Sequence, residues 1–406
     1  MKRRKLRFVD CTLRDGEQAP GVFFTLEEKV AIADLLDQAG IDVLDAGMPS
    51  VSAQERKILE TLVDRGYRAT IAGTVRANQE DIDLAVDCGL KEVFLFMPVS
   101  PQHLKHKFGI GIREVRPRIE RAIEHAAGRG LRVNFVAEDS VRADPEDLAP
   151  LFDRIGELGA QSVILCDTVG VMMPNTMEAN VRRLTSLMKN EMSLGVHCHN
   201  DYGLGTANTL AAIHAGCNVV TATVNGLGER AGNAPLEEIV CALADLERTD
   251  LGIRRPVLLA LCQMVAQASG VFLMPTKPIA GLNAFRHESG VHVDGMLKDP
   301  STYESIRPET LGLRHQLILG KHSGRGLVEA KLSSRGIRAE EGVVLKILER
   351  VKSAKESRDK KPYAEMADRL SRFWSEYLSF PEEKFWEIVD REISEASAYA
   401  LKENRL

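Results

Sequence analysis

The segment Leu194-Gly-Val-His-Cys-His199 is a short apolar run that ends in two histidines, and it belongs to a pattern that predicts the fold. Its length and apolar residues favour a buried strand, and stretches of helical period at 174–190 and 203–216 flank it. The same pair of elements recurs in both directions along the chain. The predicted strands are 6–13, 43–48, 69–75, 92–99, 132–139, 162–170, 194–199 and 219–225.

A predicted helix follows each of these strands. The helices lie at roughly 26–39, 52–65, 78–88, 113–128, 145–158, 174–190, 203–216 and 235–247. Three of them begin with expected caps, namely Thr25, Ser52, and Asp144 with Pro145 in the first turn. Consecutive strand–helix units of this number and size predict an α/β fold of the (β/α)₈ TIM-barrel type. A doubly wound open sheet is the alternative, but it usually carries fewer strands.

The alternation of strands and helices stops after residue 250. A stretch punctuated by glycine and proline leads from there into a charge-rich helical tail. We therefore expect a catalytic barrel at 1–275, a linker or lid subdomain at 276–335 and a mostly helical C-terminal subdomain at 336–406.

The bulk composition is that of an ordinary globular chain. The 406 residues are 44% hydrophobic and carry a formal net charge of -5, so a large core is expected and a nucleic-acid partner is not. No window approaches the ~18 apolar residues of a membrane span, and the basic N-terminus lacks the apolar stretch of a secretory signal. We expect no membrane partner and a cytoplasmic location. The seven scattered cysteines are expected to be reduced and packed.

Ionisable residues at the carboxyl ends of the predicted strands should gather on one rim of a barrel. His197 and His199 alternate with Cys198, so their imidazoles project together from one strand face. Asp15 ends the first strand, which only the eighth strand separates from the seventh. These three residues predict a site for a divalent metal ion. Two hydrogen-bonded polar residues that line a pocket are the simpler interpretation of the histidine pair.

Further polar segments are less specific. Glu138 and Asp139 end the fifth strand, and we expect Glu138 to point into the pocket. The glycine-rich run 225–235 precedes a helix, where backbone amides can hold an anion. Its glycine spacing does not match a dinucleotide-binding fingerprint. His287 and His292 lie in a glycine-bounded segment that is most simply read as a surface loop.

Four motifs together resemble a known enzyme family. They are Thr12-Leu-Arg-Asp-Gly-Glu-Gln18, His197-Cys-His-Asn-Asp201, Asn225-Gly-Leu-Gly-Glu-Arg-Ala-Gly-Asn233 and His287-Glu-Ser-Gly-Val-His-Val-Asp-Gly295. In this order, between about residues 6 and 330, they resemble the homocitrate synthase and 2-isopropylmalate synthase family. The resemblance implies a TIM-barrel enzyme that joins acetyl-CoA to a 2-oxo acid in a Claisen-type condensation. The enzyme then hydrolyses the thioester to release CoA.

The resemblance also implies roles for individual residues. The implied ligands of a divalent ion (Mn²⁺, Mg²⁺ or Zn²⁺) are Asp15, His197, His199 and Asn233. Arg14 matches the arginine that stabilises the developing oxyanion, and Thr168 matches the contact to the oxo-acid carboxylate. The implied acid–base groups are Glu138, His292 and Tyr303. In relatives the region after the barrel reaches over the partner subunit's site, which implies a homodimer with His292 and Tyr303 acting across the interface.

Substrate choice is where the family pattern breaks down. In lysine-pathway homocitrate synthases, the far carboxylate of 2-oxoglutarate meets three polar residues, and Thr74, Asn134 and Val136 stand at the corresponding positions. Phe94 stands where relatives often carry a polar residue, and the rim residues Gln18 and Arg76 complete the predicted substrate-binding set.

Two shorter motifs, Glu17-Gln-Ala-Pro-Gly21 and Pro98-Val-Ser100, look closest to homocitrate synthases of nitrogenase cofactor assembly. That likeness favours 2-oxoglutarate as the substrate. The apolar residues Phe94 and Val136 keep isopropylmalate, Re-type citrate, phosphonomethylmalate and benzylmalate synthases open as alternatives.

Two other classes are weighed against a synthase. A hydroxyacyl-CoA lyase would use a cysteine in the loop after the eighth strand, where this chain carries Leu227, Glu229, Arg230 and Ala231. A non-catalytic, metal-stabilised barrel would be expected to have lost Arg14, Glu138 or His292, and all three are present.

Overall fold

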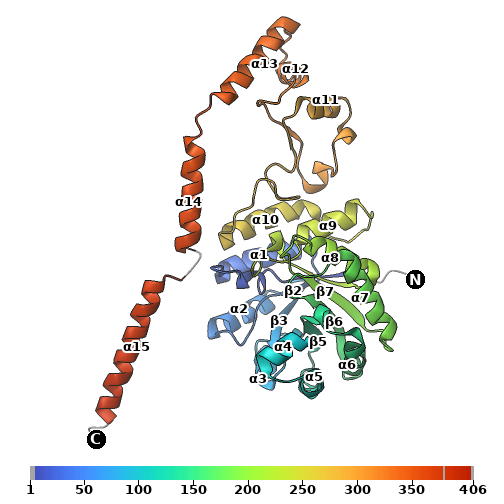
Figure 1. Cartoon of the computed structure of the whole chain (residues 1–406), viewed down its shortest axis with the longest axis vertical. Coiled ribbons are helices and arrows are strands. Elements are labelled where there is room, and N and C mark those ends of the chain that lie inside the picture. Colours follow the sequence, from blue (N-terminus) through green and yellow to red (C-terminus); the bar gives the residue numbers. More distant parts are fainter. Residues whose placement is uncertain (1–4, 378–379, 404–406) are drawn as a thin grey trace.

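A closed barrel of eight parallel strands forms the centre of the protein, in a computed structural model that describes residues 5–377 and 380–403 (Figure 1). The strands are β1 (Arg7–Asp10), β2 (Val43–Asp45), β3 (Thr70–Arg76), β4 (Glu92–Pro98), β5 (Arg132–Glu138), β6 (Ala160–Asp167), β7 (Ser193–Cys198) and β8 (Val219–Ala222). Each strand pairs with the next, and β8 pairs with β1 from Arg7↔Val219 to Asp10↔Ala222. The predicted TIM barrel is therefore confirmed, and the open sheet is excluded.

Helices surround the barrel in the predicted order. They are α1 (Leu26–Ala39), α2 (Ala53–Asp64), α3 (Gln79–Asp87), α5 (Ile112–Gly128), α6 (Pro145–Glu157), α7 (Pro174–Leu187), α8 (Gly205–Ala215) and α9 (Leu236–Asp245). The three predicted caps are present. Thr25 forms a capping box with Glu28, and the side chains of Ser52 and Asp144 accept hydrogen bonds from first-turn amides.

Several shorter elements and one long helix were not predicted. The long one is α10 (Arg255–Ser269), which packs against α1 and η4. The loop after β4 forms α4 (Pro101–His103) and η2 (Leu104–Phe108). Single turns are found at η1 (Gly16–Gln18), η3 (Ser140–Arg142) and η4 (Val224–Gly226). The loop after β4 matters most, because it carries side chains into the cavity described below.

Side chains inside the barrel form layers, as the fold requires. One layer is apolar and contains Phe94 and Ile164. A polar layer lies nearer the amino ends of the strands. There the buried carboxylate of Glu92 accepts hydrogen bonds from Arg7 Nη1 at 2.7 Å and from Asn134 Nδ2 at 2.8 Å, and Ser162 Oγ donates to Asn134 Oδ1 at 2.7 Å. These layers fill the lower barrel, so a ligand cavity has to lie above them.

The chain after α10 leaves the barrel (Figure 1). It contains β9 (Arg286–His287), α11 (Gly290–Lys298), η5 (Pro300–Thr302), η6 (Pro308–Leu311), β10 (Gln316–Leu317) and α12 (Arg325–Ser333), with β9 and β10 paired in parallel. Three helices follow, namely α13 (Glu341–Glu356), α14 (Lys361–Tyr377) and α15 (Glu382–Glu403). Figure 1 shows α14 and α15 as separate rods beside the barrel. The helical character predicted for this region is confirmed, while the domain boundaries remain a prediction. Among the described residues, no helix is long and apolar enough to cross a membrane.

Candidate active site

A cavity of about 220 Å³ opens at the carboxyl ends of the barrel strands. This end of the barrel is where TIM-barrel enzymes carry their active sites. Ten of the predicted site residues line it, namely Arg14, Asp15, Gln18, Thr74, Phe94, Val136, Glu138, Thr168, His197 and His199. The cavity therefore brings together predicted residues from the β1 end to the β7 end of the barrel, and Asp15 and His199 among them are 184 positions apart in the chain.

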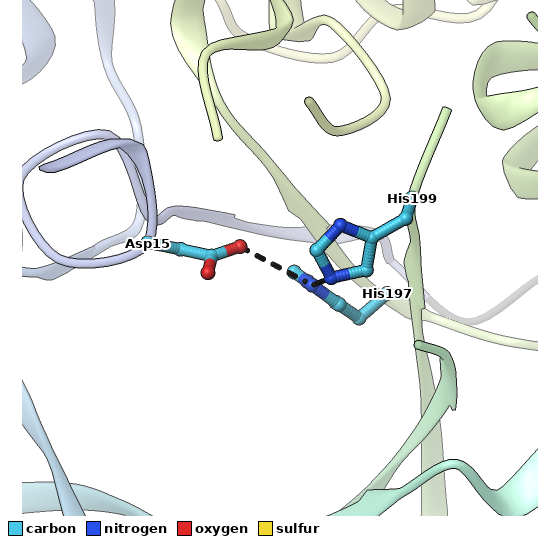
Figure 2. Close-up of side chains that lie close together, drawn as sticks. All are labelled: Asp15, His197 and His199. Atoms are coloured by element: carbon cyan, nitrogen blue, oxygen red, sulfur yellow. Dashed lines mark hydrogen bonds and ion pairs between the residues drawn. The ribbon is translucent and has the colours of Figure 1, made fainter. Parts of the chain in front are cut away.

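Three potential metal ligands meet on one wall of the cavity (Figure 2). His197 Nε2 lies 3.3 Å from Asp15 Oδ2 and 3.4 Å from His199 Nε2. All three side chains are buried, and their ligand atoms lie within 4.8 Å of one another. Imidazole nitrogens and a carboxylate oxygen that point at one place repel each other unless a proton or a metal cation lies between them. The donor set, two imidazoles and a carboxylate, suits a divalent transition metal.

The orientation of His197 is fixed by a residue outside the ligand set. Thr221 Oγ1 donates its only proton to the carbonyl oxygen of Val196 at 3.0 Å. His197 Nδ1 lies 2.8 Å from Thr221 Oγ1, whose proton is already used, so Nδ1 is the protonated nitrogen and donates to this hydroxyl oxygen. The lone pair of Nε2 then faces Asp15 and His199, which is the tautomer that a metal ligand needs.

The electrostatics of the cluster also suit a cation. Burial, and to a smaller extent the neighbouring His197, lower the pKa of His199 to about 4. His199 is therefore neutral near pH 7. Burial raises the pKa of Asp15, but the adjacent guanidinium of Arg14 is the strongest of the opposing interactions, which together hold the pKa well below its usual range. A neutral imidazole and an ionised carboxylate are the forms that coordinate metals.

Asn233 adjoins the cluster through the backbone and through its side chain. It forms an isolated bridge with His199, and its Nδ2 donates to Asp15 Oδ2 at 2.6 Å. Its Oδ1 is buried and has no hydrogen-bond partner in the described part of the chain. A Cβ on Gly228 would lie 2.6 Å from the amide nitrogen of Asn233, so the glycine lets the loop close over this side chain. The residue that contacts Asp15 thus also carries a buried amide oxygen without a partner, which fits a further metal ligand.

Arg14 supplies fixed positive charge next to the cluster. Its Nε donates to Asp45 Oδ2 at 2.8 Å, and its Nη1 pairs with Asp15 Oδ1 at 3.1 Å. Burial by itself would lower the pKa of Arg14, but Asp45 and Asp15 raise it above its ordinary value. The guanidinium stays charged and is held rigidly at the cavity wall.

Glu138 lies on the other side of the barrel, at the end of β5. Its side chain is 17% exposed and lines the cavity, while Asp139 is fully buried and does not. His103 Nδ1 lies 3.0 Å from Glu138 Oε1, and Lys107 pairs with the same oxygen. The cavity therefore has a carboxylate facing the metal-ligand cluster across its width.

Thr168 is held by two neighbouring loops. Its Oγ1 accepts a hydrogen bond from the Asp139 amide at 2.9 Å, and its carbonyl accepts one from Arg230 Nη2 at 2.8 Å. Arg230 is itself held by Asp201, with Nε donating to Oδ1 at 2.8 Å. The run 225–235 thus contributes Arg230 and Glu229 to the cavity wall, in addition to backbone amides.

Two predicted substrate contacts, Asn134 and Arg76, do not line the cavity. Asn134 faces the barrel interior, but it lies two residues below Val136 on β5, about 6.6 Å deeper at ~3.3 Å per residue. Its amide is used by Glu92 and Ser162, outside the cavity. Arg76 turns away from the cavity because Asp81, in the first turn of α3, binds its guanidinium through Nε at 2.8 Å and Nη2 at 2.6 Å.

His292 and Tyr303 do not reach this cavity within one chain. They stack on each other after the barrel, with ring centroids 4.2 Å apart, and both are exposed. The structure thus separates these two predicted acid–base groups from Glu138. Their action across a dimer interface remains a prediction.

Other residues of the cavity were not predicted as site residues. They include Asp45, Met48, Phe96, Lys107, Ile164, Thr221, Glu229 and Arg230. Asp45 ends β2 and Arg230 lies in the segment after β8, so a charged residue at the rim could have indicated both as site residues. Lys107 lies in the short helical segment after β4. The sequence could have predicted this segment, because Ser100-Pro101 is a typical helix start.

The fold and the cavity define a class of protein, a TIM-barrel enzyme with a metal-ligand cluster, a half-buried arginine and an opposing carboxylate. The chain belongs to the HMGL-like family, whose model matches residues 5–265. A second model, described as homocitrate synthase post-HMGL domain-like, matches residues 279–359. The family recognised from the four motifs is thereby confirmed.

Individual relatives agree with this assignment. The chain is 44% identical over 344 residues to homocitrate synthase AksA of Methanopyrus kandleri, covering 85% of this chain and 86% of the relative. It is 41% identical over 349 residues to a probable 2-isopropylmalate synthase of Ignicoccus hospitalis, covering 86% and 87%. The solved hydroxymethylglutaryl-CoA lyase of Pseudomonas aeruginosa superposes with a TM-score of 0.59 at 24% identity, covering 65% and 93%. That last similarity concerns the fold alone.

Proposed function

We propose that this enzyme condenses acetyl-CoA with a 2-oxo acid and then hydrolyses the thioester to release CoA. The observation that carries the proposal is that a metal-ligand cluster and a carboxylate face each other across one cavity, with Arg14 beside the cluster. A condensation of this kind needs an electrophilic carbonyl and a base that can form the enolate of the thioester. The relatives that carry synthase names support the same chemistry.

Asp15, His197, His199 and Asn233 would hold the divalent ion, which would polarise the keto group of the oxo acid when bound. Arg14 is placed to stabilise the negative charge that develops on the keto oxygen as the new carbon–carbon bond forms. Because Asp45 and Asp15 already fix its guanidinium, little reorganisation is needed during the reaction. Thr168 would bind the oxo-acid carboxylate, with Arg230 holding its loop in place.

Glu138 is the proposed base. One methyl C–H bond of acetyl-CoA breaks, an O–H bond forms on Glu138, and the electron pair passes into the enolate. The enolate carbon then attacks the keto carbon. His292 and Tyr303 would assist the later hydrolysis from the partner subunit of a homodimer, a contribution that one chain alone cannot make because neither side chain lines the cavity.

For the oxo acid, we propose 2-oxoglutarate, which makes the enzyme a homocitrate synthase. The similarity to AksA supports this choice. One feature of the cavity favours a second candidate, a short apolar oxo acid of the isopropylmalate synthase type. Its lower wall is formed by Phe94, Phe96, Val136 and Ile164. The cavity cations that could bind a second carboxylate of the oxo acid, Lys107 and Arg230, are already paired with Glu138 and Asp201.

The proposal is tested by following thiol release from acetyl-CoA with a panel of 2-oxo acids. The panel contains 2-oxoglutarate, its shorter dicarboxylic homologue, pyruvate and a branched apolar acid, each with and without prior treatment by a chelator. We expect release with at least one acid, loss of activity after metal removal, and recovery on adding Mn²⁺, Mg²⁺ or Zn²⁺. Activity that survives thorough metal removal, or no release with any acid, would contradict the proposal. The preferred acid decides between the two candidates.

A further inference from the structure

The carboxylate of Glu138 is held from one side only. Oε1 lies 3.0 Å from His103 Nδ1 and also pairs with Lys107. Oε2 has no hydrogen-bond partner among residues 5–377 and 380–403. An ionised carboxylate can only accept, so Nδ1 of His103 donates in this contact. One oxygen is thus anchored and the other is free.

His103 stands behind Glu138. The cavity is lined by Glu138 and Lys107, but His103 does not line it. Its other ring nitrogen, Nε2, lies 3.6 Å from Asp139 Oδ2, so the imidazole is placed between two successive carboxylates. His103 therefore has no access to the reacting atoms and can act only through its neighbours.

The position of His103 is set by a rigid local structure. Ser100 caps α4 by accepting a hydrogen bond from the His103 amide at 3.2 Å, and it donates its own hydroxyl proton to Asp139. Asp139 is fully buried, adopts a left-handed backbone with φ 59°, and accepts a hydrogen bond from Arg142 Nε at 2.8 Å. These contacts tie the loop after β4 to the end of β5. The histidine and the glutamate are thus fixed relative to each other.

We propose that His103 is a positioning residue for Glu138, which directs Oε2 into the cavity as the atom that takes the proton. This inference rests on the proposed function of Glu138 as the base. When Oε2 takes a proton from the acetyl methyl group, Oε1 remains an acceptor for the Nδ1–H of His103. The anchor therefore persists in both protonation states of Glu138, and the carboxyl plane need not turn during the reaction.

Lys107 binds the same oxygen but differs in character. Its side chain is 48% exposed, whereas that of His103 is 18% exposed. A solvated, flexible ammonium group contributes charge but little geometric constraint. Lys107 is therefore a charge partner of Oε1, and the matched control is Lys105→Gln, because Lys105 lies exposed on the same loop and does not line the cavity.

The kinetic test compares His103→Ala, His103→Asn and the control Lys105→Gln with the wild-type chain. The asparagine variant matters most, because its side-chain N–H can take the place of Nδ1. For His103→Ala we expect kcat to fall about 10- to 100-fold, with the KM for the oxo acid changed by less than about 3-fold. His103→Asn should restore kcat to within about 5-fold of wild type. An unchanged kcat in His103→Ala, or no recovery in His103→Asn with normal folding, would overturn the inference.

A second measurement does not depend on activity. The ring nitrogens of His103 are followed by NMR in histidine-labelled protein, with the signal assigned by its loss in His103→Asn. We expect Glu138→Gln to shift this signal, while the exposed Glu146→Gln leaves it unchanged. If the His103 signal does not shift in Glu138→Gln, the pairing is overturned, whatever reaction the enzyme performs. If the pairing is seen but no oxo acid supports thiol release, the proposed function fails and the pairing stands.

Discussion

His197 donates from Nδ1 to Thr221 Oγ1 at 2.8 Å, and this contact presents the lone pair of Nε2 to the metal-ligand cluster. Thr221 lies on β8, next to β7 in the closed barrel, so the strand pairing itself supplies the outer partner of the ligand. The cluster and its outer partner thus come from three adjacent strands: the histidines from the end of β7, Thr221 from β8, and Asp15 from the segment after β1.

Removing this outer partner should weaken metal binding without removing a ligand. We expect Thr221→Val to raise the Kd for Zn²⁺ or Mn²⁺ by about 10- to 100-fold, because His197 loses the group that fixes its tautomer. Isothermal titration of metal into metal-free protein measures the effect. The matched control is Thr185→Val, which removes a similar hydroxyl contact to a helix carbonyl, that of Val181. Equal affinities in the two variants would show that Thr221 has no such role.

Replacing the proposed base should affect turnover and leave binding nearly intact. We expect Glu138→Gln to lower kcat by about 100-fold or more, while the KM for the oxo acid changes by less than about 3-fold. The glutamine keeps the size of the side chain but cannot accept the proton. Steady-state thiol release measures both constants, and the exposed Glu146→Gln serves as the control. Near-normal turnover would mean that another group abstracts the proton.

Asn134 should matter for stability and not for substrate choice. Its Nδ2 donates to the buried Glu92, and its Oδ1 accepts from Ser162. We expect Asn134→Leu to lower the free energy of unfolding by about 2–4 kcal/mol, since it leaves buried polar groups with fewer partners. The preferred oxo acid and its KM should not change. Urea denaturation and the substrate panel measure the two effects, and a changed preference would place Asn134 back among the substrate contacts.

The sequence predicted the barrel better than the details of the site. Strand ends are readable because buried parallel strands are apolar, so a charged residue such as Asp15 or Glu138 marks the rim. The depth of a residue inside the barrel is harder to predict from sequence. Asn134 and Val136 point to the same side of β5, and only the packing of the interior layers shows that Val136 lines the cavity and Asn134 does not. Arg76 was misplaced because its partner Asp81 belongs to the next helix, whose first turn competes with the cavity for the guanidinium.

The contacts that the loop after β4 makes with Glu138 could not be predicted from the sequence. His103 and Lys107 form no motif with Glu138, since 35 and 31 residues separate them from it. Only the pairing of β4 with β5 brings Pro98 level with Glu138 and carries the loop to the carboxylate. His292 and Tyr303 show the opposite case, in which the family motif is present but one chain does not place it in the cavity.

A final prediction concerns a carboxyl group beneath the site. Burial raises the pKa of Asp10, hydrogen bonds from the Thr12 amide at 2.9 Å and hydroxyl at 3.0 Å offset this in part, and the net pKa is about 7. Between about pH 4 and pH 7, the unfolded chain therefore loses this proton while the folded chain retains it. The folded state binds more protons in this range, so its stability falls as the pH rises.

Asp10→Asn should remove this dependence. An uncharged amide can still accept from the Thr12 amide, but it does not titrate. Wild type should lose about 2–3 kcal/mol more than the variant between pH 5 and pH 8, at about 1.4 kcal/mol per pKa unit. Urea midpoints at the two pH values measure the difference, with the exposed Asp64→Asn as control. Parallel curves for wild type and Asp10→Asn would show that Asp10 is ionised in the folded protein throughout this range, because its hydrogen bonds then outweigh burial.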